Sequence, residues 1–366
     1  MSQNNRSILL LSIAFALIFF GFNGVQQYVT VYFDQLGQGS VGFVSLLLVY
    51  LFFMIFSPLA VPIMTKLGMV PTMILGGLVY GLYIYSLMVP SVVLVLVASC
   101  LLGVAAGMLW TAQGSYLLRS SDAGSYGRSA GLFTMIWALG AALGMMLFGF
   151  VSGRLGYHYS LILWGSIPFL GVGLLFFLPP RNVQDSRSTF MASLDGKMIR
   201  LGIVNFVFMF MFGLVIGSIP LVLKNSFSLV VIGIMGSLFF VTSVLCSYLG
   251  GRLSDIFGRR LLVMIGFLCA VLGLVCLVIP NKWIVLVGII LVSLMYAIMG
   301  PVLQAMAGDF GNTEQNVATF SAFRNFGVVV SLLAGLFIAV PMIFYVSLGV
   351  VVAGSVAVFS EVRKWG

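Results

Sequence analysis

The stretch "GGRLSDIFGRR", Gly250 to Arg260, is a polar loop between two long apolar runs. Glycines let a chain turn tightly and let helices approach closely, and an aspartate can accept hydrogen bonds from amides at the start of a neighbouring helix. Arginines hold a loop at the anionic face of a membrane. A plain basic loop would account for the arginines, but it would not account for the spacing of the glycines and the aspartate. We therefore interpret five of its residues as a specific motif and not as a plain basic loop: Gly251, Asp255, Gly258, Arg259 and Arg260.

The composition on both sides of this loop indicates a membrane protein. Of the 366 residues, 61% are hydrophobic and 7% are charged, whereas a soluble domain carries about 25% charged residues. The four cysteines all lie in apolar runs, and with the single histidine they show no metal-ligand spacing. The sequence also holds no catalytic triad pattern and no phosphate-binding loop. We therefore expect an integral membrane protein that is not an enzyme and has no cofactor or metal.

Twelve stretches are long and apolar enough to cross a bilayer, which takes about 20 residues each. Together they predict an all-α membrane protein, and an even number of crossings puts both termini on one side. The predicted spans are 8–29, 41–64, 71–89, 92–118, 128–151, 159–178, 199–223, 228–250, 261–280, 283–307, 317–340 and 342–360.

The basic residues indicate the orientation of these spans. With both termini inside, three of the 17 lysines and arginines fall in outer loops (Arg154, Lys224 and Lys282), and the other 14 fall on the inner side. Cytoplasmic loops of membrane proteins carry such an excess. We expect both termini in the cytoplasm and a location in the plasma or inner membrane. Because the net charge of +9 reflects this sidedness, we expect no nucleic-acid partner.

The longest polar break, Pro179 to Arg200, divides the chain into two halves. Six spans, a linker and six spans are the layout of transporters built from parallel repeats. A weak repeat at an offset of about 191 residues supports this division, because Gln113 matches Gln304 and the loop around Gly68 matches the loop around Gly258. We predict two pseudo-symmetric six-helix bundles, 1–178 and 199–366, joined by a cytoplasmic linker, 179–198.

The loop that begins at Gly250 resembles the cytoplasmic signature of the major facilitator superfamily. It departs from that signature at Ile256, where a basic residue is usual. The corresponding loop of the first half, "VPIMTKLGMV" at 61–70, has Thr65 in the place of the aspartate. The resemblance implies the major facilitator fold of two six-helix bundles in a lipid bilayer, and it implies a gating role for Gly251, Asp255, Gly258, Arg259 and Arg260. We expect the protein to be a monomer.

A second stretch, "LWTAQGSYL" at 109–117, looks like a signature of the Uncoordinated-ninety-three-like branch of that superfamily. The stretch "FGFNGVQQ" at 20–27 is similar to the same branch, and the resemblance covers most of residues 15–150. The chain lacks the long outer loops that are common in animal members. We therefore expect a prokaryotic relative.

Several polar and aromatic side chains are candidates for binding a solute. In the superfamily that the loop resembles, spans one, four, seven and ten line a central cavity. Amides in a membrane must find partners or face water, and these spans carry several of them. The alternative is that they link helices by hydrogen bonds worth about 0.6 kcal/mol each. The candidate substrate-binding residues are Asn23, Gln26, Gln27, Trp110, Gln113, Tyr116, Asn205, Tyr296 and Gln304.

The charged residues narrow the function. No acidic residue lies deep in a predicted span, although proton-coupled carriers usually place one there. We expect Arg324 near Asp309 and Glu314 on the cytoplasmic side, with a role in gating. A cavity of amides and aromatic rings suits a small neutral or zwitterionic organic solute, and the predicted function is a secondary transporter that moves it by alternating access. The alternative is an accessory protein that partners another membrane protein, as members of the resembled branch do.

Overall fold

The computed structural model describes residues 3–35, 37–89, 91–181, 183, 196–217, 229–279, 281–309, 313–338 and 340–362. The secondary structure of this part of the chain consists of twelve α-helices and one short 3-10 turn, η1 (Ala123–Ser125). The α-helices are α1 (Gln3–Gln35), α2 (Gly39–Leu67), α3 (Met69–Ser86), α4 (Val92–Arg119), α5 (Tyr126–Leu155), α6 (Tyr157–Leu175), α7 (Gly196–Gly217), α9 (Leu229–Phe257), α10 (Arg259–Val278), α11 (Lys282–Asp309), α12 (Thr313–Phe337) and α13 (Val340–Val362).

Each of the twelve predicted spans corresponds to one of these helices, so the prediction of an all-α membrane fold is confirmed. Among the described residues, eleven helices are long and apolar enough to cross a bilayer, and α13 contributes a shorter apolar segment, Met342–Val356. The physical reason is that hydrocarbon offers no partner to backbone N–H and C=O groups, which a helix satisfies internally.

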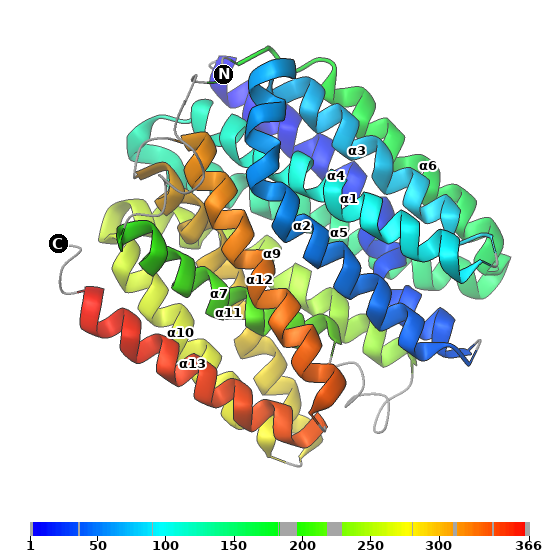
Figure 1. Cartoon of the computed structure of the whole chain (residues 1–366). Coiled ribbons are helices and arrows are strands. Elements are labelled where there is room, and N and C mark those ends of the chain that lie inside the picture. Colours follow the sequence, from blue (N-terminus) through cyan, green and yellow to red (C-terminus); the bar gives the residue numbers. More distant parts are fainter. Residues whose placement is uncertain are drawn as a thin grey trace.

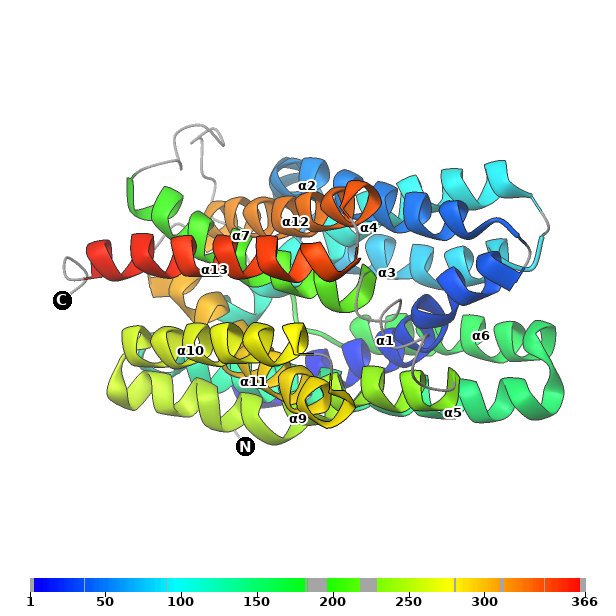
Figure 2. The same ribbon diagram turned by 90° about the horizontal axis from the view of Figure 1, so that it is seen from below.

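The helices lie side by side in a bundle with two ends (Figure 2). Helix α1 begins and α13 ends at the same end of the bundle (Figures 1 and 2). We call this end the terminal face; the α2–α3, α4–α5 and α9–α10 turns lie there too. Gly68 and Gly258, which the sequence repeat pairs, both turn the chain with φ of +90°, a conformation that favours glycine.

The packing of the helices follows the two halves of the chain. In the first half, α1 packs against α5 and α6, and α4 packs against α2 and α3. In the second half, α7 packs against α12, and α11 packs against α9 and α10. The halves meet chiefly where α5 lies along α9 and where α2 lies along α12. The domain boundaries at 178 and 199 stay a prediction, and linker residues 184–195 lie outside the described residues.

Two glycines of α5 let this helix lie directly on the backbone of α1. A Cβ atom at Gly140 would overlap the Ala16 carbonyl, and one at Gly144 would overlap the Phe20 carbonyl. Small residues at helix interfaces permit such close approach in membranes, where packing replaces the hydrophobic effect as the driving force. The Gly144 carbonyl also accepts a hydrogen bond of 3.1 Å from the Trp164 indole. The packing of Gly140 and Gly144 on the backbone of α1 fixes the position of that helix, which supplies part of the site described below.

We expect Gly144→Val to destabilise the fold by about 1–3 kcal/mol, the usual cost of overpacking, because the valine would overlap the backbone of α1. The measurement is the midpoint of thermal unfolding of the detergent-purified protein. The matched control is Gly153→Val on the same helix, where a Cβ would meet no atom within 4 Å. Equal midpoints for the two variants would contradict the packing of α5 on α1.

Candidate functional site

A cavity of about 160 Å³ lies between the two halves of the chain. Helices α1 to α5 contribute to its wall from the first half, and α7, α9, α11 and α12 contribute from the second half. The spans that the family resemblance implied, α1, α4, α7 and α11, are all among them. Most of the wall is apolar or aromatic with a few polar side chains, which is the composition of pockets for organic molecules.

Six of the nine candidate substrate-binding residues line this cavity. Two of them, Gln113 on α4 and Gln304 on α11, are repeat partners, and the Gln304 amide donates to the Gln113 carbonyl oxygen across the two halves at 3.5 Å. On α1, Gln26 is hydrogen-bonded to the Tyr50 hydroxyl of α2. The role of these residues in binding stays a prediction. The six are Asn23, Gln26, Trp110, Gln113, Tyr296 and Gln304.

The structure places two other candidates away from the cavity, which corrects the prediction. Tyr116 is fully buried one helical turn beyond Gln113, and its hydroxyl donates to the Pro179 carbonyl at 2.9 Å. Asn205 is also fully buried, and its amide donates to the Leu201 carbonyl of its own helix at 2.8 Å. They were predicted because they lie on spans that the family resemblance assigns to the cavity, but neighbouring segments cover both side chains. The ninth candidate, Gln27, has a side chain outside the described part.

Aromatic rings form much of the cavity wall. Trp110 and Trp137 meet edge to face with ring centroids 5.5 Å apart. The Tyr296 ring stacks on that of Phe212 at 5.4 Å and lies 4.5 Å from that of Phe239. The sequence did not single out Trp137 or these phenylalanines, because nothing in an apolar run distinguishes a ring that faces a cavity from one that faces lipid.

Arg324 lines the cavity, which corrects its predicted place beside Asp309 and Glu314. The physical reason is its position on α12, where ten residues after Glu314 correspond to about 15 Å of helix rise. The Arg324 Nη2 atom lies 3.7 Å from the Met209 sulfur of α7. The phenols of Tyr50 and Tyr296 are close enough to interact electrostatically with its guanidinium.

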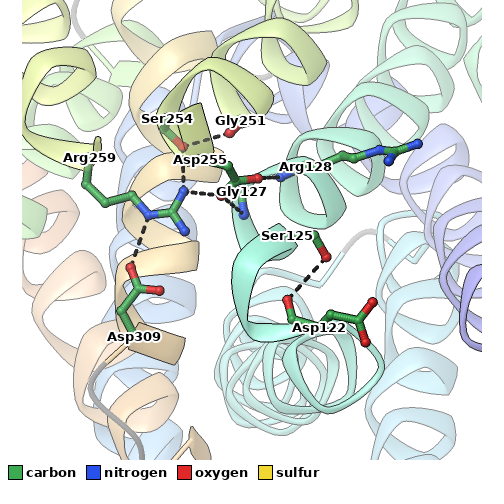
Figure 3. Close-up of polar contacts among 9 residues, drawn as sticks. All are labelled: Asp122, Ser125, Gly127, Arg128, Gly251, Ser254, Asp255, Arg259 and Asp309. Atoms are coloured by element: carbon green, nitrogen blue, oxygen red, sulfur yellow. Dashed lines mark hydrogen bonds and ion pairs between the residues drawn. The ribbon is translucent and has the colours of Figure 1, made fainter. Parts of the chain in front are cut away.

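The cavity is separated from the terminal face by contacts that join the two halves, and Asp255 makes the first of them (Figure 3). Its carboxylate, near the end of α9, accepts hydrogen bonds from the backbone amides of Gly127 at 3.0 Å and Arg128 at 2.7 Å. These amides lie in the first turn of α5, where Ser125 provides no side-chain cap. A negative charge at a helix N-terminus is stabilising. The predicted acceptor role of Asp255 is thereby confirmed.

Arg259 organises the rest of the predicted gating loop. Its guanidinium contacts Asp255, donates to the Ser254 hydroxyl at 2.6 Å, and donates to the Asp309 carboxylate at 3.0 Å (Figure 3). It therefore ties the start of α10 to the ends of α9 and α11. The other gating candidates differ in their surroundings: the Gly251 backbone touches Gly127, Gly258 turns the chain, and Arg260 is exposed.

A second contact between the halves, which is an ion pair, was missed from the sequence. Arg119, at the end of α4, binds Glu314, in the first turn of α12, through two hydrogen bonds of 2.9 Å. Bidentate pairs of this kind are among the strong polar contacts, and Glu314 is fully buried. The sequence did contain a signal for this pair. Arg119 follows Gln113 and Glu314 follows Gln304, and these two glutamines are repeat partners, so both charged residues are expected at the same end of the bundle.

The first-half loop contains no equivalent of the Asp255 contact. Thr65, at the corresponding position, is exposed and donates to the Pro62 carbonyl of its own helix at 2.9 Å. A threonine hydroxyl is uncharged, and in the described structure this one forms its bond within α2. In the described structure the loop contact with the other half therefore comes from the second half alone, and its gating role stays a prediction.

Comparison with protein families finds two models that match different parts of the chain. Residues 201–364 match the model of the Major Facilitator Superfamily, and residues 37–217 match the model described as ion channel regulatory protein UNC-93. The second match contains the stretch at 109–117 and most of the first-half helices.

Among named relatives, the chain is similar to three kinds of protein. It is 34% identical over 141 residues to the UNC93-like protein MFSD11 of Xenopus tropicalis, covering 38% of this chain and 31% of that one. It is 33% identical over 127 residues to UNC93-like protein 3 of Arabidopsis thaliana, covering 35% and 26%. It is 29% identical over 182 residues to the uncharacterized MFS-type transporter YcaD of Salmonella paratyphi B, covering 47% and 46%. Each match therefore spans less than half of the relative.

Two solved structures share the fold along nearly the whole chain. The human organic anion transporter MFSD10 (TETRAN) superposes with a TM-score of 0.79 at 16% identity, covering 98% of this chain and 100% of that one. The proton:xylose symporter XylE, bound to 6-bromo-6-deoxy-D-glucose, superposes with a TM-score of 0.80 at 13% identity, covering 98% and 96%. At these identities the likeness shows the fold alone, and it confirms the predicted major facilitator fold.

We expect Glu314→Gln to loosen the terminal face, because it removes the charge that holds Arg119. A cysteine placed at Ser120, which is 1% exposed beside Arg119, serves as the reporter. Its rate of reaction with a maleimide in detergent should rise about tenfold, which corresponds to a loss of about 1.4 kcal/mol in the closed state. The background chain carries serine at the native cysteines: Cys100, Cys246, Cys269 and Cys276.

The control for this measurement is Asp122→Asn. Asp122 is exposed near the same end of α4, and its side chain caps no helix. It should leave the labelling rate at the reporter unchanged. An unchanged rate in Glu314→Gln as well would show that the Arg119–Glu314 pair does not hold this end of the bundle closed.

Proposed function

Because the chain is a member of the major facilitator superfamily, we propose that it is a secondary transporter that carries a small organic solute across the membrane by alternating access. The observation that carries this proposal is the position of the cavity. It lies between the two halves, and polar contacts at the terminal face join these halves. A rocking motion of the halves would open such a cavity to one side at a time.

The contacts at the terminal face suit a gate. The Arg119–Glu314 pair joins α4 to α12, and Asp255 joins α9 to the first turn of α5. On the same two helices as the ion pair, α4 and α12, Gly114 lies against Val317 in the cavity wall, so that a Cβ on the glycine would approach the valine to 2.7 Å. Water can replace the partners of an ion pair or of a backbone amide when the halves separate. The gate can therefore open without leaving buried polar groups unsatisfied.

The cavity lining supports an organic solute. The amides of Asn23, Gln26, Gln113 and Gln304 offer both donors and acceptors, and the aromatic rings offer surfaces for an apolar body. The described lining contains no carboxylate that would hold a divalent cation. The expected neutral or zwitterionic solute stays a prediction, and Arg324 bears on it below.

We further propose that the terminal face is cytoplasmic and that the protein lies in the plasma or inner membrane as a monomer. The support is the distribution of charge, because 13 of the 17 basic residues fall in segments assigned to this face once Arg324 is counted with the cavity. Helices with this bias insert with their basic loops in the cytoplasm.

A second function is favoured by one specific observation. Residues 37–217 match a model whose description is ion channel regulatory protein UNC-93. An accessory protein that regulates another membrane protein could keep this fold without the gating motion. The two functions differ in whether the contacts at the terminal face must open, so variants at these contacts separate them.

We expect a ligand to stabilise the purified protein in a thermal-shift screen of small organic solutes. A ligand at 100 times its Kd stabilises by about 2.7 kcal/mol. Gln113→Ala should keep its own unfolding midpoint and lose the response, because Gln113 lies in the cavity wall and its amide nitrogen is without an acceptor in the described structure. Failure of Gln113→Ala to fold would instead identify the amide as a link between helices. Silence over the panel, together with a membrane protein that co-purifies, would favour the accessory function.

We expect Asp255→Ala to lower the turnover rate in proteoliposomes while leaving the solute affinity unchanged, because Asp255 stands at the gate and not in the cavity. Losing a hydrogen bond to a charged group changes an equilibrium by about 1.5–3 kcal/mol, so we expect a reduction of about tenfold. The measurement compares initial uptake rates with Kd values from solute titration. The exposed Asp122→Asn serves as the control, and full turnover in Asp255→Ala would exclude the gating role.

A further inference from the structure

Arg324 is a cation in the middle of the bundle that the proposed gate does not use. It lies on α12 in the cavity wall and is half-buried. Within the described part of the chain, its guanidinium donates to the Met209 sulfur at 3.7 Å. A thioether is a weak acceptor, and a guanidinium stays charged at every physiological pH. Ionisable side chains at membrane depth carry a high cost and usually mark a substrate or ion pathway.

The described carboxylates lie elsewhere and have other roles. Asp255 and Asp309 bind Arg259, and Glu314 binds Arg119, all at the terminal face. Asp122 is exposed beside η1. Among the carboxylates whose side chains the structure describes, none faces Arg324 to balance its charge. A buried charge without a partner is costly, so the cavity favours an occupant that brings the opposite charge.

Other polar groups of the cavity wall are also donors in need of an acceptor. The Trp137 indole N–H and the Gln113 amide nitrogen are buried and have no acceptor among the described residues, and both side chains line the cavity. An indole N–H can only donate. The hydroxyl groups of Tyr50 and Tyr296 lie near the Arg324 guanidinium and can donate as well. The lining therefore complements a group that accepts hydrogen bonds and carries negative charge.

We propose that the solute of this cavity is an organic monoanion, a carboxylate or sulfonate on an aromatic or apolar body, whose charged group binds Arg324. The inference names the substrate class and rests on the proposed transport function. One cation balances one negative charge, and a guanidinium matches planar or multi-oxygen anions through paired hydrogen bonds.

The rings next to Arg324 supply the place for the body of the solute. Tyr296 stacks on Phe212, and Phe239 lies 4.5 Å from the same tyrosine. Tyr50 adds a further ring, with its centroid 6.5 Å from that of Phe212. Aromatic faces pack well against flat apolar groups. A solute with its charged end at Arg324 can therefore rest its apolar part on this wall.

The binding site spans both halves of the chain, so that binding of the solute affects how the two halves move relative to each other. Arg324 and Tyr296 belong to the second half, whereas Tyr50 belongs to the first. An anion between them would contact both halves and remove the unbalanced charge. Closure around a filled cavity is then easier than closure around an empty one.

The test uses the full chain purified in detergent and two pairs of probes that differ in charge but little in shape: benzoate with benzamide, and benzenesulfonate with benzenesulfonamide. Binding is measured by titration calorimetry and by the shift of the thermal midpoint at low ionic strength. We expect each anion to bind at least about tenfold more tightly than its amide, because hydrogen bonds to charged groups are the stronger ones. Equal binding of an anion and its amide, or no stabilisation by either anion, would overturn the proposal.

Variants at Arg324 assign the effect to this residue. Arg324→Gln should abolish the preference for the anions, and Arg324→Lys should retain part of it. The exposed Arg252→Gln at the terminal face should bind as the wild type does. Without a probe, Arg324→Gln should unfold at a midpoint no lower than that of the wild type, because no counter-charge is lost. A marked fall would reveal a structural ion pair and overturn the proposal.

Uptake separates failure of this inference from failure of the proposed function. Radiolabelled benzenesulfonate is charged at every pH and does not cross lipid unaided, so its entry into proteoliposomes reports transport. Binding that depends on Arg324 without any uptake would keep the anion site and reject the transporter. Uptake of a neutral solute that is unchanged in Arg324→Gln would keep the transporter and reject the anion site.

Discussion

The hydrocarbon core of a membrane contains no water, and this constraint decides where every polar group of the chain lies. Backbone groups are satisfied within the helices. Buried hydroxyls along the spans turn back to their own backbone, as Ser12, Ser243 and Ser293 do toward carbonyls four residues earlier. Other polar side chains bond to a neighbouring helix of the same half, as Trp164 does to the Gly144 carbonyl, or they face the cavity between the halves or the terminal face. The cavity and the gate are thus consequences of one rule applied to two bundles.

The two polar contacts at the gate differ in kind. Asp255 acts as a cap for a helix of the other half, so it joins a side chain to a backbone dipole. Arg119 and Glu314 form a side-chain fork with fixed geometry. They lie between different pairs of helices, α5 with α9 and α4 with α12. Together they hold the halves at two separate points of one end, which resists rotation as well as separation.

The sequence predicted the fold well because hydropathy and loop charge report directly on membrane crossing. The twelve spans and the all-α fold followed from these patterns, and the role of Asp255 followed from the chemistry of a carboxylate near a helix start. The site was predicted only in part. Six amide and aromatic positions line the cavity, whereas Tyr116 and Asn205 are covered by neighbouring segments. Periodicity gives the face of a helix, but it does not give the depth at which a cavity ends.

The charged residues show the same limit. Arg324 was placed with the nearest acids in sequence, but the rise of α12 carries it about 15 Å beyond Glu314 and into the cavity. Arg119 and Glu314 are 195 residues apart and meet only because the two halves face each other. Pairs of this kind depend on the relative position of the bundles. A single chain without three-dimensional information does not contain that position in any local pattern.

The backbones of α5 and α9 touch at Gly127 and Gly251, where a Cβ on either residue would overlap the other helix. This contact joins the two halves and holds neither half together internally. A bulky residue at 251 would therefore act as a wedge between two intact bundles, and not as a defect within one. Such a chain would be trapped with its terminal face open. Antibody fragments raised against it would recognise the conformation opposite to the one described, and would provide a tool for isolating that state.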